Sequence, residues 1–311
     1  MAGPPQTTSR APRRRKKLNQ PLIKSVIVLA AATVTAVGSA ITGLGAHLAF
    51  APMLTWMFGY APEKAQGTAL RYGLIATLAA VAVSLYYQDH AAVHVSRGLL
   101  LVIGATIGAV AAAPLSPKPA AIGARRALQA IAILAAIFTV TEATHMSALT
   151  RSQSHYAHWD AWWQLVSLGL VVGAITQAAR LTGGTLLMPA LFFLTAMPDR
   201  LSATGVRPIT ASEAVTEALI VVFAASLMPA WGYAQRRLAD STYFMPSTLG
   251  AIVGGAFGGW LLTRLLERSV LVAFGVVAMF FAAREIARLA AETSAAPPAA
   301  PSDVQDPNAS Q

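Results

Sequence analysis

Long apolar stretches, separated by short polar segments, make up most of this 311-residue chain. The stretches of the first half cover residues 22–44, 48–58, 67–87, 98–115 and 127–140, and those of the second half cover 161–179, 181–197, 209–228, 243–263 and 269–283. Each full-length stretch approaches the ~20 residues that a helix needs to cross a bilayer. The pattern therefore predicts an all-α polytopic membrane protein.

The order of the stretches predicts about eight transmembrane helices in two homologous four-helix repeats. The second stretch of each half is short, and we interpret it as the continuation of a broken first helix. The predicted organisation is a disordered basic tail (1–20), a first repeat (21–141), a polar connector (142–160), a second repeat (161–289) and a disordered C-terminal tail (290–311). An even number of crossings places both termini on one side, and parallel and inverted repeats both fit the pattern.

Composition agrees with a membrane protein. Hydrophobic residues make up 55% of the chain and charged residues 12%, against about 25% charged residues in soluble domains. The net charge of +10 is concentrated in the basic head at residues 10–17, directly before the first apolar stretch. Such a cluster predicts cytoplasmic termini and contact with anionic lipid, not nucleic acid. A signal peptide also begins with a basic head, but the apolar run here exceeds its usual ~7–15 residues.

Two of the apolar stretches are interrupted in the same way. At residues 38–54 the helical pattern breaks into small residues and resumes around Pro52, and at 173–191 it does so around Pro189. The glycines of the first break are Gly43 and Gly45, and the second break reads Thr182, Gly183, Gly184. Glycine disfavours helix, and inside a bilayer the freed backbone groups need protein or a ligand. Two broken helices, one in each half, are typical of a transporter binding site.

Three further motifs recur in the same order in both halves. They are a Pro-Xaa-Leu step (52–54 and 189–191), a small-residue helix start (65–68 and 203–206) and a Gly-Ala-Xaa-Xaa-Gly run (104–108 and 250–254). We interpret the glycines of the last motif, with Gly258, as faces on which helices pack closely.

Taken together over residues 25–288, these motifs resemble the sulfite exporter TauE/SafE family. The resemblance implies a prokaryotic-type inner-membrane permease that moves sulfite, sulfonates or related organic anions without an ATPase domain. The chain departs from the family pattern at Ala46 and His47, where further glycines are expected, and at Arg180, just before the second glycine pair.

Four ionisable residues near the breaks are candidates for the site. His47 is either a proton-linked or hydrogen-bonding ligand or a histidine satisfied by freed carbonyls. Arg180 could bind two oxygens of an anion at once. The alternatives are that its side chain extends toward the membrane interface or forms a salt bridge with Glu213 or Glu217. Arg71 and Arg207 follow the two helix starts, and Arg71 is the deeper of the two. The predicted substrate site comprises Gly43, Gly45, His47, Arg71, Arg180, Thr182, Gly183 and Gly184.

Two carboxylates and several histidines complete the candidates. Glu213 and Glu217 are four residues apart and share a helix face, so with His47 they are predicted proton-coupling groups; the alternative is that they pair with arginines. His90 with His94, and His145 with His155 and His158, suggest a metal site. We expect exposed polar residues there instead, and no metal, because the chain has no cysteine.

The leading hypothesis is a secondary transporter that moves a small anion by alternating access at the two broken helices, with proton coupling as an open feature. The competing hypothesis is an intramembrane enzyme in which His47 acts with Glu213 and Glu217 as acid–base groups, which requires them to converge. We expect a non-enzyme with no cofactor, whose partners are the substrate and membrane lipid. A homodimer is one assembly open to it.

Overall fold

The computed structural model describes residues 21–88, 91–112, 121–145, 161–179, 183–194, 196–198 and 206–295. Within them the chain forms helices and one short strand pair, so the predicted helical membrane fold is confirmed. The helices are α1 (Pro21–Thr42), α2 (His47–Phe58), α3 (Pro62–Tyr87), α4 (Ala91–Ala112), α5 (Ala121–His145), α6 (Trp162–Ala179), α7 (Gly183–Leu194), α8 (Ala211–Gln235), α9 (Phe244–Leu262) and α10 (Glu267–Ala295). Each corresponds to one predicted apolar stretch.

Six of the described helices are long and apolar enough to cross a membrane: α1, α3, α4, α8, α9 and α10. Shorter apolar segments lie in α5, α6 and α7. Exposed aromatic side chains lie near the ends of several helices: Trp56 near the end of α2, Tyr86 at the end of α3, Trp162 at the start of α6 and Trp231 near the end of α8. Such aromatic belts mark membrane–water interfaces. The number of crossings stays a prediction.

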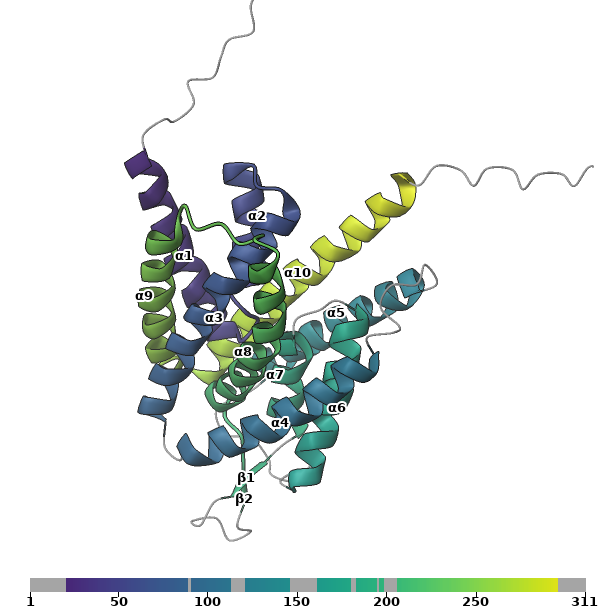
Figure 1. Ribbon diagram of the computed structural model, residues 1–311. Coiled ribbons are helices and arrows are strands. Elements are labelled where there is room, and N and C mark those ends of the chain that lie inside the picture. Colours follow the sequence, from purple (N-terminus) through teal and green to yellow (C-terminus); the bar gives the residue numbers. More distant parts are fainter. Residues whose placement is uncertain are drawn as a thin grey trace, which may run out of the picture.

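The first break reverses the direction of the chain. α1 ends at Thr42, and Gly43 and Gly45 adopt positive φ angles of 71° and 88°, which glycine tolerates without strain. α2 then begins at His47 and returns toward the end of the molecule where α1 starts (Figure 1). The two helices therefore form a re-entrant hairpin.

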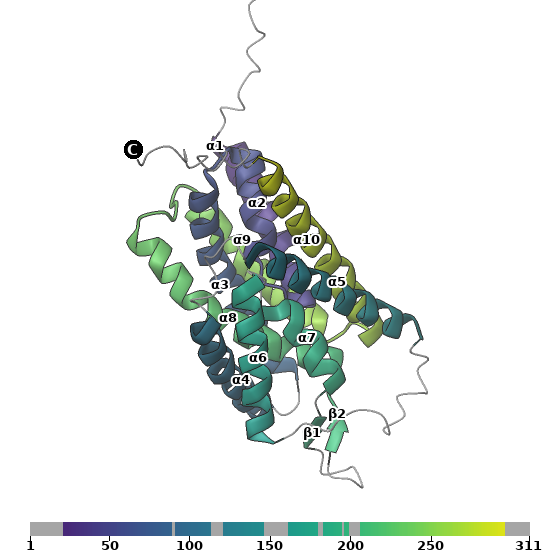
Figure 2. The ribbon, with the colours of Figure 1, turned by 90° about the vertical axis from the view of Figure 1, so that its right-hand side faces the viewer.

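The second break forms a hairpin of the opposite orientation. α7 returns toward the end at which α6 starts, the end that carries the strand pair (Figure 2). Arg180 and Thr182 lie outside the described residues. The two hairpins thus approach the middle of the molecule from opposite ends. α1 begins and α10 ends at the same end, as an even number of crossings requires (Figure 1).

The repeated glycine motifs are packing faces, as predicted. α4 packs along α6, and α9 packs along α1. A Cβ added at Gly104 or Gly108 would collide with carbonyl oxygens of α6, and one added at Gly254 would collide with the Thr33 carbonyl of α1. The absence of a side chain lets the helix backbones approach closely, which is how helices associate in membranes.

The segment before α8 differs from the sequence prediction. Residues 203–206 were expected to start a helix, but Val206 lies in β2 (Val206–Pro208), which pairs antiparallel with β1 (Ala196–Pro198). The helix starts only after Pro208, where Thr210 and Glu213 form a capping box with each other's backbone N–H groups. Proline has no N–H to donate and so favours this later start.

Three predicted boundaries also shift. α5 continues to His145, beyond the predicted end of the first repeat at 141, and α10 continues to Ala295, beyond 289. In the first half, the predicted helix start at 65–68 lies inside α3, which begins at Pro62. The predicted tail at 1–20, the remainder of the connector (146–160) and residues 296–311 lie outside the described residues.

Candidate functional site

The two glycine breaks meet at the centre of the molecule. A Cβ added at Gly184, in the first turn of α7, would lie closer than 3.0 Å to the carbonyl oxygen of Gly43. The same atom would lie 3.3 Å from the Cα of Leu44. Only a residue without a side chain fits between these two backbones. The N-terminal end of α7 therefore rests on the turn between α1 and α2.

His47 is buried in the first turn of α2, against the break and α3. Its Cε1 atom would be 2.9 Å from a Cβ on Gly45, and its own Cβ would be 3.2 Å from a Cβ on Gly73 of α3. Val222 of α8 also contacts the Gly45 position. Gly43, Gly45, His47 and Gly184 of the predicted site thus come together.

A cavity of about 400 Å³ opens beside the first break. Its polar walls are Thr35, Ser39 and Thr42 of α1, and Phe280 with other α10 side chains forms the apolar wall. The Thr42 hydroxyl donates to the Gly38 carbonyl (2.7 Å), and the Thr35 hydroxyl bonds the Tyr72 hydroxyl (2.7 Å). The cavity is thus mostly apolar with a few fixed hydroxyl groups, which is the usual character of a small-molecule site.

Arg71 is placed away from the break. Its guanidinium carbon lies 4.7 Å from the centroid of the Phe244 ring, at the start of α9. It precedes Gly73, which contacts His47, by two positions and therefore leaves α3 on a different face. Of the other predicted site residues, Arg180 and Thr182 lie outside the described residues, and Gly183 begins α7.

The two predicted glutamates belong to a separate, buried ionic cluster between α4 and α8. The Glu217 Oε1 atom accepts a hydrogen bond from Arg97 Nε (2.8 Å) and lies 3.1 Å from His94 Nδ1. The His94 Nε2 atom lies 3.6 Å from Glu213 Oε1. All four side chains are buried. We refer to His94, Arg97, Glu213 and Glu217 as the α4–α8 cluster.

For Glu217, the alternative of pairing with an arginine is what the structure shows, and the partner is Arg97, which the sequence did not single out. His94 was expected to be an exposed polar residue; this was wrong, since it is fully buried. The signal available was the i, i+3 spacing of a histidine and an arginine next to an apolar stretch. Within the described residues no group of histidine and carboxylate side chains could hold a metal ion; His90, His155 and His158 lie outside them.

The α4–α8 cluster and the glycine breaks lie on different faces of α8. Gly43 packs against Val215 and Ala218, and Gly45 packs against Val222. At 100° per residue these positions lie roughly 150° around the helix from Glu213 and Glu217. The body of α8, about 10 Å across, thus lies between His47 and the carboxylates. This arrangement does not bring His47 together with Glu213 and Glu217, as an acid–base site would require.

These features define a multi-pass helical membrane protein built around two opposed re-entrant hairpins whose glycine breaks meet. The model of the sulfite exporter TauE/SafE family matches residues 5–139 and 165–307, and the chain belongs to this family. It is accordingly a membrane transporter.

Curated relatives agree with this class. A protein of Xylella fastidiosa (strain Temecula1 / ATCC 700964), named "Probable membrane transporter protein", is 26% identical over 228 residues, which cover 72% of this chain and 79% of that protein. A protein of the same name from strain 9a5c is 26% identical over 227 residues, covering 71% and 78%. No solved structure matches the chain.

Proposed function

We propose that the protein is a secondary permease of the inner membrane that moves a small anion, namely sulfite, a sulfonate or a related organic anion. The observation that carries the proposal is the contact between the two breaks, Gly184 against the Gly43 carbonyl, beside a cavity of about 400 Å³. Broken helices that meet near the midplane form the substrate sites of many transporters.

The same contact supports alternating access. The two hairpins approach from opposite ends, and the packing of α4 on α6 mirrors that of α9 on α1. We therefore propose that the two repeats are inverted and that each hairpin lies on the path to one side of the membrane. A tilt of one repeat against the other would open the shared break to either side in turn.

Three groups would attract an anion to this place. The N-terminal ends of α2 and α7 carry the positive end of the helix dipole. The hydroxyl groups of Ser39 and Thr42 face the cavity, although Thr42 already donates to Gly38. Arg180 follows α6 directly in the sequence, and a guanidinium binds two anionic oxygens at once.

Flux measurements on purified protein in proteoliposomes test this proposal. We expect exchange of labelled sulfite or sulfonate across the membrane, and loss of exchange in Gly184→Ala and Arg180→Ala. The matched control is Gly232→Ala, because nothing lies within 4 Å of a Cβ at this position. If wild-type protein exchanges no small anion, the proposed function is wrong. If Arg180→Ala exchanges normally, only the role of that side chain is wrong.

A further inference from the structure

Two helices pack mainly on the repeat to which they do not belong in sequence. α9, from the second half of the chain, lies against α1 and α3, and α4, from the first half, lies against α6 and α8. A Cβ added at Gly254 would collide with the Thr33 carbonyl of α1, and one at Gly255 would collide with the Ala76 carbonyl of α3. Backbones this close leave no room for sliding. With α2 on α3 and α7 on α8, the helices form a first body (α1, α2, α3 and α9) and a second body (α4, α6, α7 and α8).

A contact between ionisable side chains fixes the start of each exchanged helix to its body. Just before α9, the Asp240 carboxylate lies 2.7 Å from Lys64 Nζ, in the first turn of α3. In the first turn of α4, His94 Nε2 lies 3.6 Å from Glu213 Oε1, in the first turn of α8. Asp240 follows His94 by the same number of residues as separates the two copies of the Gly-Ala-Xaa-Xaa-Gly motif. The two contacts are therefore counterparts in the two repeats, with the acidic and basic partners exchanged.

The next turn of each exchanged helix is also packed against its body. A Cβ added at Gly98 of α4 would lie 2.9 Å from Ile220 of α8, so these helices are in tight contact. At the equivalent place in the first body, the guanidinium carbon of Arg71 lies 4.7 Å from the centroid of the Phe244 ring of α9. Each exchanged helix is thus held by a polar contact at its start, a packed contact one turn later and glycine packing along its length.

The two bodies meet along α3 and α8, which run antiparallel to each other. Near one end of this seam, the Thr216 hydroxyl donates to the Ser84 hydroxyl (3.2 Å). Near the other end, Tyr233 covers Gly67, where an added Cβ would lie 3.1 Å from the Tyr233 Cβ. Thr216 follows Gly67 by as many residues as Tyr233 follows Ser84, so these two contacts are also counterparts. About 25 Å of helix separates them.

The glycine breaks lie between these two contacts. Gly73 of α3 packs against His47, and Val222 of α8 packs against Gly45. Both positions fall between the residues that make the end contacts of their helices. Along the seam, an anion held at the breaks therefore has the Ser84–Thr216 contact on one side and the Gly67–Tyr233 contact on the other.

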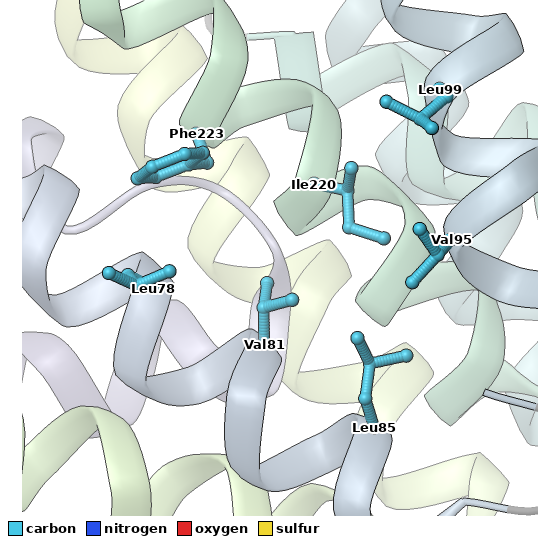
Figure 3. A pocket seen from close by; sticks show the side chains of 7 residues that line it. All are labelled: Leu78, Val81, Leu85, Val95, Leu99, Ile220 and Phe223. Atoms are coloured by element: carbon cyan, nitrogen blue, oxygen red, sulfur yellow. The ribbon is translucent and has the colours of Figure 1, made fainter. Parts of the chain in front are cut away.

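The seam between the bodies is incompletely filled. An apolar pocket of about 170 Å³ lies where α3 meets the second body (Figure 3). Leu78, Val81 and Leu85 of α3 line one side, and side chains of α4 and α8, Val95 and Ile220 among them, line the other. Facing apolar walls form no directional bonds, and atoms next to a void have fewer packing contacts to lose. α3 can therefore shift against the second body at a lower cost than α9 can shift against α1.

We propose that transport moves the first body against the second, each together with its exchanged helix, and that the Gly67–Tyr233 and Ser84–Thr216 contacts open in turn as the two gates. This inference rests on the proposed function and specifies which helices tilt together. α9 moves with α1, α2 and α3, and α4 moves with α6, α7 and α8, so the sequence repeats are not the moving units. Tightly packed elements move as rigid units, and the change is taken up at the interface between them.

Disulfide cross-links test the two gates. The chain has no cysteine, so a disulfide within it forms only where two cysteines are introduced. The gate variants are Ser84→Cys/Thr216→Cys and Gly67→Cys/Tyr233→Cys. Exchange of labelled anion is measured in proteoliposomes of each variant after oxidation and again after reduction. We expect oxidation of either gate variant to abolish exchange and reduction to restore it, because exchange needs both gates to open.

The matched control is a cross-link inside the second body, Gly98→Cys/Ile220→Cys. Its two Cβ atoms would lie 3.2 Å apart, against 3.1 Å for Gly67→Cys/Tyr233→Cys. Both separations are near the ~3.5–4.5 Å of a disulfide. The control joins α4 to α8 and thus the first sequence repeat to the second. We expect oxidised control protein to exchange anion as well as the reduced protein does.

The outcomes are distinct. Exchange that persists in a fully oxidised gate variant would overturn the proposal, because the bodies would not need to separate there. Exchange that is lost on oxidation of the control would overturn it as well, because the sequence repeats would then be the moving units. Wild-type protein that exchanges no anion would refute the transport function, and the motion of the bodies is then decided by the following measurement.

Labelling of single cysteines requires no flux and only a conservative substitution. Ser84 lies in the seam between the bodies, and Ser247 lies on α9 inside the first body; both are buried. Ser84→Cys should react with a water-soluble thiol reagent in liposomes, at a rate that changes when sulfite is added, because α3 and α8 separate at this gate. Ser247→Cys should stay protected under the same conditions. Equal protection of the two cysteines, or equal reaction of both, would overturn the proposal.

Discussion

Substitution of Gly184 by alanine tests the contact on which the proposed site depends. The added methyl group would lie closer than 3.0 Å to the Gly43 carbonyl oxygen and 3.3 Å from the Leu44 Cα. Both obstacles are backbone atoms of a tight turn, so no side-chain rotation can relieve the collision. The hairpins α1–α2 and α6–α7 must move apart at the point where their breaks meet.

The magnitude follows from known costs of overpacking. Adding a methylene-sized group to a well-packed interior costs about 1–3 kcal/mol, and a backbone obstacle puts Gly184→Ala at the upper end of this range. Unfolding carries about 2.1 cal/mol/K of entropy per residue, so 1 kcal/mol changes the Tm of this 311-residue chain by about 1.5 °C, and we expect a decrease of about 3–5 °C for this variant. Exchange flux should fall with it, because the site loses its geometry.

The assay is thermal unfolding of the purified protein in detergent, with flux measured on the same preparation. Gly232→Ala in α8 is the matched control, since it adds the same methyl group to a helix where nothing lies within 4 Å. Alanine should stabilise that position by about 0.5–1 kcal/mol. If Gly184→Ala unfolds at the temperature of Gly232→Ala and exchanges anion like wild type, the two breaks do not meet as described.

Three further variants test other parts of the structure. Arg97→Leu should lower the free energy of unfolding by about 3–5 kcal/mol because it leaves Glu217 buried without its cation, and adding Glu217→Leu should restore most of the loss; a double variant as unstable as the single one would contradict this. Gly45→Ala should cost about 1–2 kcal/mol through its φ of +88°, measured by the same unfolding assay, and more if His47 cannot shift; an unchanged Tm would contradict it. Burial alone would raise the pKa of Asp240 in the α8–α9 connection, but Lys64 (2.7 Å), Thr242 and Tyr60 together hold the pKa of this carboxyl well below its usual value. Wild type should therefore be more stable than Asp240→Asn at neutral pH, with the difference in Tm shrinking as the pH falls below the ordinary value of about 3.8; a difference that grows in acid would contradict the ion pair.

Much of the fold was predictable because a bilayer imposes simple rules on sequence. Every described helix corresponds to an apolar stretch. A segment in lipid must make its backbone hydrogen bonds internally, and it exposes few polar side chains to the lipid. The breaks were predictable as well, because glycine disfavours helix and marks the point at which an apolar helix is interrupted. The short β1–β2 pair was not, as three-residue strands leave no periodic pattern to detect.

The sequence by itself therefore determined the class of protein, the position of the two glycine breaks and the packing role of the repeated glycines, all of which depend on local residue type. Only the tertiary structure decided what those elements contact. It brought Gly184 onto the Gly43 carbonyl, placed the first glycine break and the glutamates on different faces of α8, and paired Glu217 with Arg97 and His94, 120 and 123 positions earlier in the chain. The physical reason is that side-chain pairing across helices depends on how each helix is rotated and which neighbour it meets, and residue spacing within one helix does not contain this information.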